Sequence, residues 1–449
     1  MPPSSASSPA PAHRDSPDAP EHGAGPEVPL RRHRPFLLLC AEQATSSGGR
    51  AVTALALPLL AITRLDAGPL GAASLMALTY LPAVLLSPFI GVLVDRARLR
   101  RLLAALTALH VLVIGSVPLT VAVGGFGWPQ LFAVAALSGA LTATVTVALQ
   151  SALPRVVRPG RLMRANSVLT GTRTAGLIGG PALGGVLIGV AGPAPALLVE
   201  CAAYALAVLL FLGLPARLNT PAGGTGPSAR SQMDSLREGL DVLRHETLLR
   251  RQALAAAGLN LGGGAAGALF VLYAGRDLGL PAWQLGAVYA AYAVAAGVGV
   301  LVATPVTRVL GMGRTTQLCA VGAGASLFLL PVASVGPAFA VLLLYELCFG
   351  LLATVWMIAM ITGRQLVTPT RLLGRVNAFL QAALTATLPV GALAGGALAA
   401  RVGIVPVLTG AAAVALVGAA GLWFPRDLHS GIDRAARAAR EQEPGRAEA

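Results

Sequence analysis

Residues 91–101 read Gly91-Val92-Leu93-Val94-Asp95-Arg96-Ala97-Arg98-Leu99-Arg100-Arg101, which places one acid and four arginines between two long apolar runs. Charge of this density is not stable in hydrocarbon, so the stretch predicts a short loop at which two membrane helices meet water. The simplest interpretation is a loop that only fixes topology. The alternative is a loop that takes part in a conformational change.

The composition of the chain also indicates a membrane protein. The chain has 449 residues, of which 55% are hydrophobic and 12% charged, and its mean hydropathy is +0.72. These values indicate a polytopic membrane protein. All 33 basic residues are arginine and they are spread between apolar segments, which argues against a nucleic-acid-binding module. The four cysteines also lie inside apolar segments and show no spacing typical of a disulfide framework or a metal site.

We predict an all-α protein with twelve transmembrane helices, arranged as two six-helix pseudo-repeats around a central cavity. The apolar runs are long enough to cross a bilayer. The predicted spans are 36–62, 70–92, 102–122, 130–151, 166–190, 194–214, 252–274, 284–304, 315–334, 337–361, 377–400 and 404–424.

The arginines predict the orientation. With a cytoplasmic N-terminus, 28 arginines fall in cytoplasmic segments, and only Arg64, Arg276 and Arg401 fall in outer loops. The positive-inside rule therefore favours a multi-pass protein of the bacterial cytoplasmic membrane with both termini inside the cell.

Five regions follow along the chain. Residues 1–33 have the composition of a disordered cytoplasmic tail, 34–214 form the first six-helix bundle and 252–424 the second. The linker, 215–251, ends in an amphipathic pattern, and 425–449 form a cytoplasmic tail. The linker helix suits either the membrane surface or a position beneath the two bundles.

An internal repeat relates the two bundles. A shift of 211 residues superposes Gly180 on Gly391, Gly184 on Gly395, Gly185 on Gly396 and Gly192 on Gly403. A shift of 208 residues brings residues 91–94 onto 299–302, where Ala303 and Thr304 stand in place of an acid. Duplicated six-helix halves are typical of transporters that rock about a central site.

Two motifs resemble the major facilitator superfamily. Its signature loop between spans two and three is met by Gly91, Leu93, Asp95, Arg96, Arg100 and Arg101. A pattern associated with its exporters is met by Gly176, Gly180, Pro181, Gly184 and Gly185. The resemblance implies that the loop gates conformational change by contact with span eleven, near Asn377. Topology alone for the loop, and ordinary tight packing for the glycines, are the alternatives.

Charges within spans are sparse and therefore informative. Arg50 and Glu346 fall near mid-membrane, and the resemblance implies that spans one, four, seven and ten line the cavity. We predict that Glu346 couples transport to an ion, with Arg50 or Glu42 as its partner; a static neutralising pair is the alternative. Glu200 and Arg173 are expected to lie near span ends and to snorkel. Further cavity candidates include Asn260 and Trp356.

The resemblance favours the drug and macrolide-type efflux branch. It implies a secondary transporter that exports a moderately hydrophobic small molecule by alternating access and proton antiport. Span 130–151 lacks the arginine that such exporters often carry. Either Glu42 and Glu346 carry the proton coupling instead, or transport is not coupled to protons. The alternatives are an uptake permease for a hydrophobic metabolite, and a membrane sensor or assembly factor that transports nothing.

The expected partners are the small-molecule substrate, protons and the lipid bilayer, with no nucleic acid and with a monomer favoured. No P-loop pattern, paired catalytic carboxylates or metal cluster is evident in the sequence. We therefore expect neither an enzyme nor a cofactor.

Overall fold

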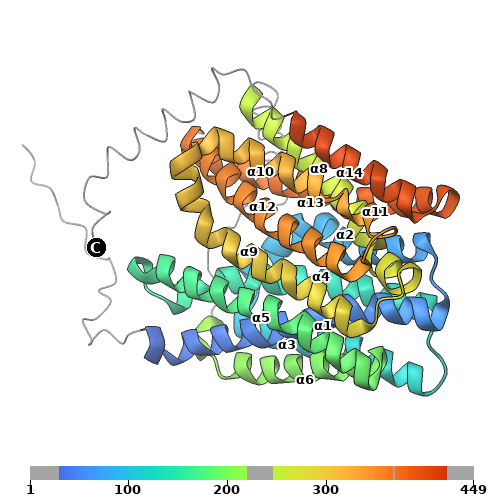
Figure 1. Ribbon diagram of the computed structural model, residues 1–449. Helices are drawn as coiled ribbons and strands as arrows, with labels where there is room; N and C mark the ends of the chain where they lie inside the picture. The colour runs from blue at the N-terminus through green and yellow to red at the C-terminus, as the bar shows by residue number, and fades with distance from the viewer. Residues whose placement is uncertain (1–29, 220–245, 368–369, 422–449) are drawn as a thin grey trace, which may run out of the picture.

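The structure is a computed structural model that describes residues 30–219, 246–367 and 370–421. Helices make up nearly all of this part of the chain, and no strand occurs in it (Figure 1). Its long helices coincide with the twelve predicted spans, which confirms the predicted fold class. The predicted linker helix and both tails lie wholly or largely outside the described residues.

The first half contains six membrane-spanning helices joined by short connections. They are α1 (Arg34–Leu65), α2 (Pro69–Arg96), α3 (Leu99–Ala122), α4 (Trp128–Val156), α5 (Leu162–Ala191) and α6 (Pro193–Leu212). Prolines stand in the first turn of α1, α2, α4 and α6, where a missing N–H costs nothing and the fixed φ suits a helix.

The second half repeats this order with two local departures. Its helices are α8 (Thr247–Leu272), α9 (Ala282–Leu310), α10 (Met312–Ser326), α11 (Leu329–Val332), α12 (Ala338–Val367), α13 (Thr370–Val402) and α14 (Ile404–Ala420). The π-helix η4 (Tyr273–Asp277) extends α8, and α10 with α11 forms one interrupted span.

Matching glycines turn the chain at equivalent points of the two halves. Gly192 joins α5 to α6 with a φ of 87°, and Gly403 joins α13 to α14 with a φ of 88°. Only glycine adopts a positive φ of this size without strain. It therefore allows a single residue to connect each pair of helices. The shift of 211 residues predicted this equivalence.

The repeat extends to contacts between helices. Gly180 and Gly184 lie against Gly48, Ala51 and Val52 of α1, whereas their counterparts Gly391 and Gly395 lie against Leu261 and Ala265 of α8. Glycine lets two helix backbones approach closely without a side chain between them. The two halves therefore share one packing scheme.

The halves meet through α5 with α9 and through α2 with α13. We name the two ends of the bundle by their connections: the α1–α2 end contains residues 66–68, and the α2–α3 end contains residues 97–98. In Figure 1, α5 and α9 approach each other at the α1–α2 end, toward the right, and diverge toward the α2–α3 end.

Candidate functional site

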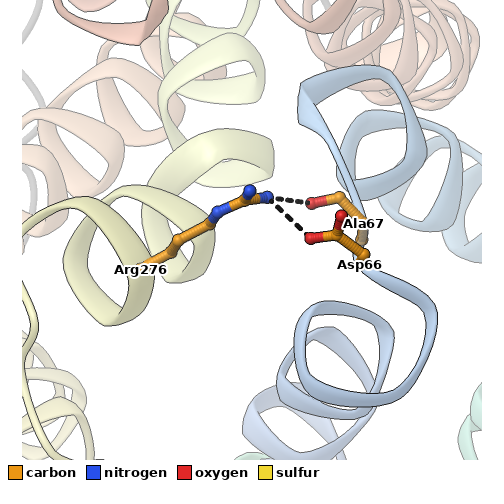
Figure 2. Close-up of polar contacts among 3 residues, drawn as sticks. All are labelled: Asp66, Ala67 and Arg276. Atoms are coloured by element: carbon orange, nitrogen blue, oxygen red, sulfur yellow. Dashed lines mark hydrogen bonds and ion pairs between the residues drawn. The ribbon is translucent and has the colours of Figure 1, made fainter.

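One ion pair joins the two halves at the α1–α2 end. Arg276, in the π-helix η4, lies 3.3 Å from the Asp66 carboxylate and donates a hydrogen bond of 3.3 Å to the Ala67 carbonyl (Figure 2). Asp66 ends α1 in the left-handed conformation, with a φ of 47°. The arginine and aspartate side chains are 47% and 88% exposed, so solvent screening leaves the pair weak.

Close backbone contacts also join the two halves at the same end. A Cβ added at Gly185 of α5 would lie 2.9 Å from the Cα of Gly286 on α9, and one added at Gly286 would lie 2.5 Å from the Pro181 carbonyl oxygen. The equivalent glycine of the second half, Gly396 on α13, lies against Ala73 on α2. Both contacts depend on glycine, since any side chain would force the helices apart.

These contacts divide the predicted glycine motif of α5 between two neighbours. Gly176, Gly180 and Gly184 face α1, within the first half, whereas Pro181 and Gly185 face α9, across the interface between the halves. The motif therefore contributes both to the packing of one half and to the closure of the α1–α2 end.

The 91–101 stretch forms the end of α2, a two-residue connection and the start of α3. Arg100 donates a hydrogen bond to the Leu212 carbonyl at the end of α6, where a cation also suits the helix dipole. Gly91 and Asp95 are half-buried, and Arg96 and Arg101 are exposed. The partner predicted for Asp95, at the start of α13, lies among side chains outside the described set.

Arg50 is the centre of an ionic cluster inside the first half. It lies within electrostatic range of Glu42 on the same helix and of Glu200 on α6, and it donates a hydrogen bond of 3.1 Å to the Ser47 hydroxyl. The two glutamates are each 1% exposed. A Cβ added at Gly49 would lie 3.1 Å from the Cγ of Glu200, so α1 and α6 are in close contact here.

Two aromatic residues complete this cluster. His110 of α3 stacks on Tyr204 of α6 with ring centroids 4.2 Å apart, and both rings lie within electrostatic range of Arg50. The expectation that Glu200 snorkels to a helix end is therefore wrong, because Glu200 is 1% exposed and lies within electrostatic range of Arg50.

Glu346 of α12 lies in a different environment. It is 7% exposed, and no basic residue pairs with it in the described part of the chain. The groups within its electrostatic range are Tyr289 and Tyr292 of α9 and Tyr345 of its own helix. The structure thus brings Arg50 and Glu42 together but does not bring either of them to Glu346.

The remaining predicted cavity residues have separate positions. The Asn260 side-chain amide donates a hydrogen bond of 3.0 Å to the Leu384 carbonyl and so ties α8 to α13. Trp356 is buried on α12, and its indole N–H finds no acceptor among the described residues. No group of three metal-ligating side chains occurs within the described ranges.

Comparison with known proteins identifies the family. The model of the Major Facilitator Superfamily matches residues 40–379. The chain belongs to the Major Facilitator Superfamily. Members of this family are transporters, and the chain is accordingly a multi-pass membrane protein of secondary transport.

Relatives and solved structures agree with this assignment. The uncharacterized MFS-type transporter y4rN of Sinorhizobium fredii is 27% identical over 404 residues, covering 87% of this chain and 95% of that protein. The MFS-type transporter YfiS of Bacillus subtilis, also uncharacterized, is 25% identical over 398 residues, 84% and 90% of the two chains.

Two solved structures illustrate the shared fold. A mutant of the nucleoside transporter NupG aligns with a TM-score of 0.71 at 12% identity, covering 87% of this chain and 99% of that chain. A bacterial homologue of the iron transporter ferroportin, in an inward-facing state, aligns with a TM-score of 0.66 at 19% identity, covering 88% and 98%. Because their substrates differ and identity is low, these structures support the fold alone.

Proposed function

We propose that this member of the superfamily exports a moderately hydrophobic small molecule across the bacterial cytoplasmic membrane in exchange for protons. The single observation that carries the proposal is Glu346, a buried carboxylate among tyrosines that has no basic partner within the described residues. An intramembrane charge without a counter-charge is costly, so the site needs a proton or a ligand to neutralise it. Alternate neutralisation by the two is the basis of an antiport cycle.

The orientation of the molecule supports loading from the cell interior. The arginine distribution favours a cytoplasmic α2–α3 end. The halves contact each other at the α1–α2 end through Gly185, Gly286 and the Asp66–Arg276 pair. In this orientation, these contacts between the halves lie at the outer end of the bundle, and a substrate would load from the opposite, cytoplasmic end.

The lining chemistry favours an organic substrate over a sugar or a phosphate ester. Sugar sites need many hydrogen-bond donors and acceptors, and phosphate sites need convergent arginines. Three tyrosines from α9 and α12 lie within electrostatic range of Glu346, and these rings contact Phe270 of α8 and Phe349 of α12. Apolar and aromatic walls with few placed polar groups are typical of sites for hydrophobic small molecules.

Everted membrane vesicles test both direction and coupling. Vesicles from cells that overproduce the chain are energised to acidify their interior and are supplied with chloramphenicol as a neutral probe and tetraphenylphosphonium as a cationic probe. We expect accumulation of at least one probe that collapses when the pH gradient is dissipated and that is lost in Glu346→Gln. Accumulation of the same size in Glu346→Gln contradicts the coupling role.

The alternatives predict different results in the same assay. An uptake permease moves the probe out of everted vesicles and into right-side-out vesicles. A sensor or assembly factor gives no flux with either probe, and its signalling phenotype persists in Asp95→Asn. Either result overturns the proposed export.

A further inference from the structure

We propose that the ionic cluster of the first half, formed by Arg50, Glu42 and Glu200, binds one proton as a resident part of the folded protein. The cluster lies where α1, α3 and α6 pack together within the first half, away from the contacts that join the two halves. The inference goes beyond the proposed export and does not depend on it.

The site is built where Gly49 lets α1 and α6 approach each other. A Cβ added at Gly49 would lie 3.1 Å from the Cγ of Glu200 and 3.3 Å from the Cβ of Ala203. Glu42 precedes Gly49 by seven residues, which is about two helical turns, and so lies on the same face of α1. Both glutamates are 1% exposed. The packing of the two helices therefore holds two acids away from water.

The cluster contains more negative than positive charge. Arg50 lies within electrostatic range of both Glu42 and Glu200. Arg173 of α5 is exposed and lies within electrostatic range of Arg50 rather than of either glutamate. One arginine compensates one carboxylate, so the second buried carboxylate keeps a charge that is costly in a low-dielectric interior.

Four buried oxygens of the cluster also lack a hydrogen-bond partner. They are Oε2 of Glu42, Oγ of Ser46, Oε2 of Glu200 and Oη of Tyr204. Ser46 adjoins Glu42, and Tyr204 adjoins both Glu200 and Arg50, yet none of these contacts has regular hydrogen-bond geometry. Buried polar atoms are normally paired. A protonated carboxyl group supplies a donor, which a carboxylate lacks, to the hydroxyl beside it.

A proton suits these groups better than water or a metal ion does. Water satisfies buried hydroxyls but leaves the excess charge in place. A metal ion needs several converging oxygens, whereas Glu42 lies eight residues before Arg50, a rise of about 12 Å, and Glu200 lies beside Gly49. A proton needs a single carboxylate oxygen and removes one negative charge.

The other titratable groups at the cluster do not supply the missing positive charge. His110 of α3 stacks on Tyr204 at a centroid distance of 4.2 Å, but it lies within electrostatic range of Arg50, which would repel a charged ring. Cys201, next to Glu200 on α6, adds no positive charge. α4 packs on α1 and α3 and carries no charged residue from 128 to 154.

Infrared spectroscopy of the purified full chain tests the inference, with Glu346→Gln as the background so that the acid of α12 does not contribute. A protonated carboxyl group has a carbonyl band that shifts in D2O, and an ionised carboxylate lacks it. We expect a band equivalent to one carboxyl group at pH 7. Glu42→Gln and Glu200→Gln should each abolish the whole band, because the remaining acid is then ionised opposite Arg50.

The resident proton also makes stability depend on pH. In the unfolded chain, glutamates are ionised above about pH 5. The folded protein then binds one proton more than the unfolded chain, which raises the unfolding constant by about tenfold per pH unit until the folded state loses the proton. Chemical denaturation of the Glu346→Gln background should show this contribution, and adding Glu200→Gln should remove it.

Glu246→Gln, an exposed glutamate at the start of α8, is the matched control and should change neither the band nor the pH dependence. Absence of the band in the background at pH 7 overturns the proton site. Loss of only half the band in each variant contradicts a single proton that depends on the shared arginine. A band that appears only when sodium is replaced by choline would also overturn it, since a metal ion then occupies the cluster.

Discussion

The two halves of the molecule have the same helix packing but differ in the surroundings of their buried acids. The glycine contacts of α5 with α1 and α9 recur as contacts of α13 with α8 and α2. On this common scaffold, the first half places Arg50 beside Glu42 and Glu200, whereas the second half leaves Glu346 among aromatic rings without a basic partner in the described ranges.

This difference separates two roles that a duplicated protein can divide between its copies. Buried acids that share a nearby arginine are partly compensated in the resting protein. An uncompensated acid is poorly satisfied in every state until something binds it. We therefore expect the first half to be the more rigid partner and the second half to be the site of ligand exchange.

The largest expected effect comes from removing the compensation. Arg50→Ala leaves Glu42 and Glu200 buried without the one positive charge near them, and we expect a loss of about 3 kcal/mol in unfolding free energy, the lower end of the range for a broken buried pair because Arg50 is only half-buried. Chemical denaturation in detergent measures it. Arg64→Ala, at the exposed end of the same helix, is the control and should be neutral.

A second substitution sharpens that test. Adding Glu200→Gln to Arg50→Ala should recover part of the loss, because one buried charge is then removed. Glu346→Gln alone should keep or raise stability. An equal loss of stability in Glu346→Gln and Arg50→Ala would contradict the distinction between the halves.

The shared backbone predicts a symmetric effect at the interface. Gly185→Val and Gly396→Val should each destabilise the closed α1–α2 end by about 1–3 kcal/mol, because the added side chain overlaps α9 or α2. Accessibility of a cysteine introduced at Ala67 to a membrane-impermeant thiol reagent, in a background lacking the native cysteines, reports opening. Gly189→Val on α5 is the control, since a Cβ there meets no atom within 4 Å. Opening by only one of the two variants would break the equivalence.

The loop at 91–101 differs in sequence between the two halves, and this difference can be tested. Asp95 has no acidic counterpart near Ala303 in the second half. If the loop gates one side only, Asp95→Asn should slow turnover by roughly tenfold, equivalent to about 1.4 kcal/mol, without changing unfolding. Flux measured at saturating probe concentration decides it. Arg98→Gln, exposed in the same loop, should be nearly neutral.

The smallest effect is expected where one residue from each half meets in solvent. Asp66→Asn or Arg276→Gln should cost less than about 1 kcal/mol, because both side chains are well exposed. A double-mutant cycle on the rate of thiol labelling at the α1–α2 end gives the coupling energy. A coupling of several kcal/mol would make the ion pair, rather than the glycine contacts, the main closure.

Much of the architecture was predictable because membrane physics acts locally on sequence. Apolar length specifies the spans, and Gly192 and Gly403 mark equivalent turns because both positions require a positive φ. The interruption of α10 at Ser326 lies inside an apolar run, and the π-helix at Tyr273 lies where such a run ends in Arg276 and Asp277, so neither left a comparable signal.

The candidate site was less predictable because its parts are distant in the chain. Arg276 pairs with Asp66 across 210 positions, and neither residue stands out in a short outer loop. Position along the membrane normal suggested Arg50 as the partner of Glu346, but depth says nothing about which half a side chain faces. Glu200 was expected at a helix end from its position along the span. Its burial depends on the close approach of α1 and α6 at Gly49, which position along the span does not predict.

The position of Gly286 on α9 links the contact between the halves to the surroundings of Glu346. Tyr289 follows it by three residues, a rise of about 4.5 Å along the helix axis. One helix therefore carries both Tyr289, which lies within electrostatic range of Glu346, and the surface that contacts α5. A ligand at Glu346 that moved this part of α9 would also disturb the contact between the halves.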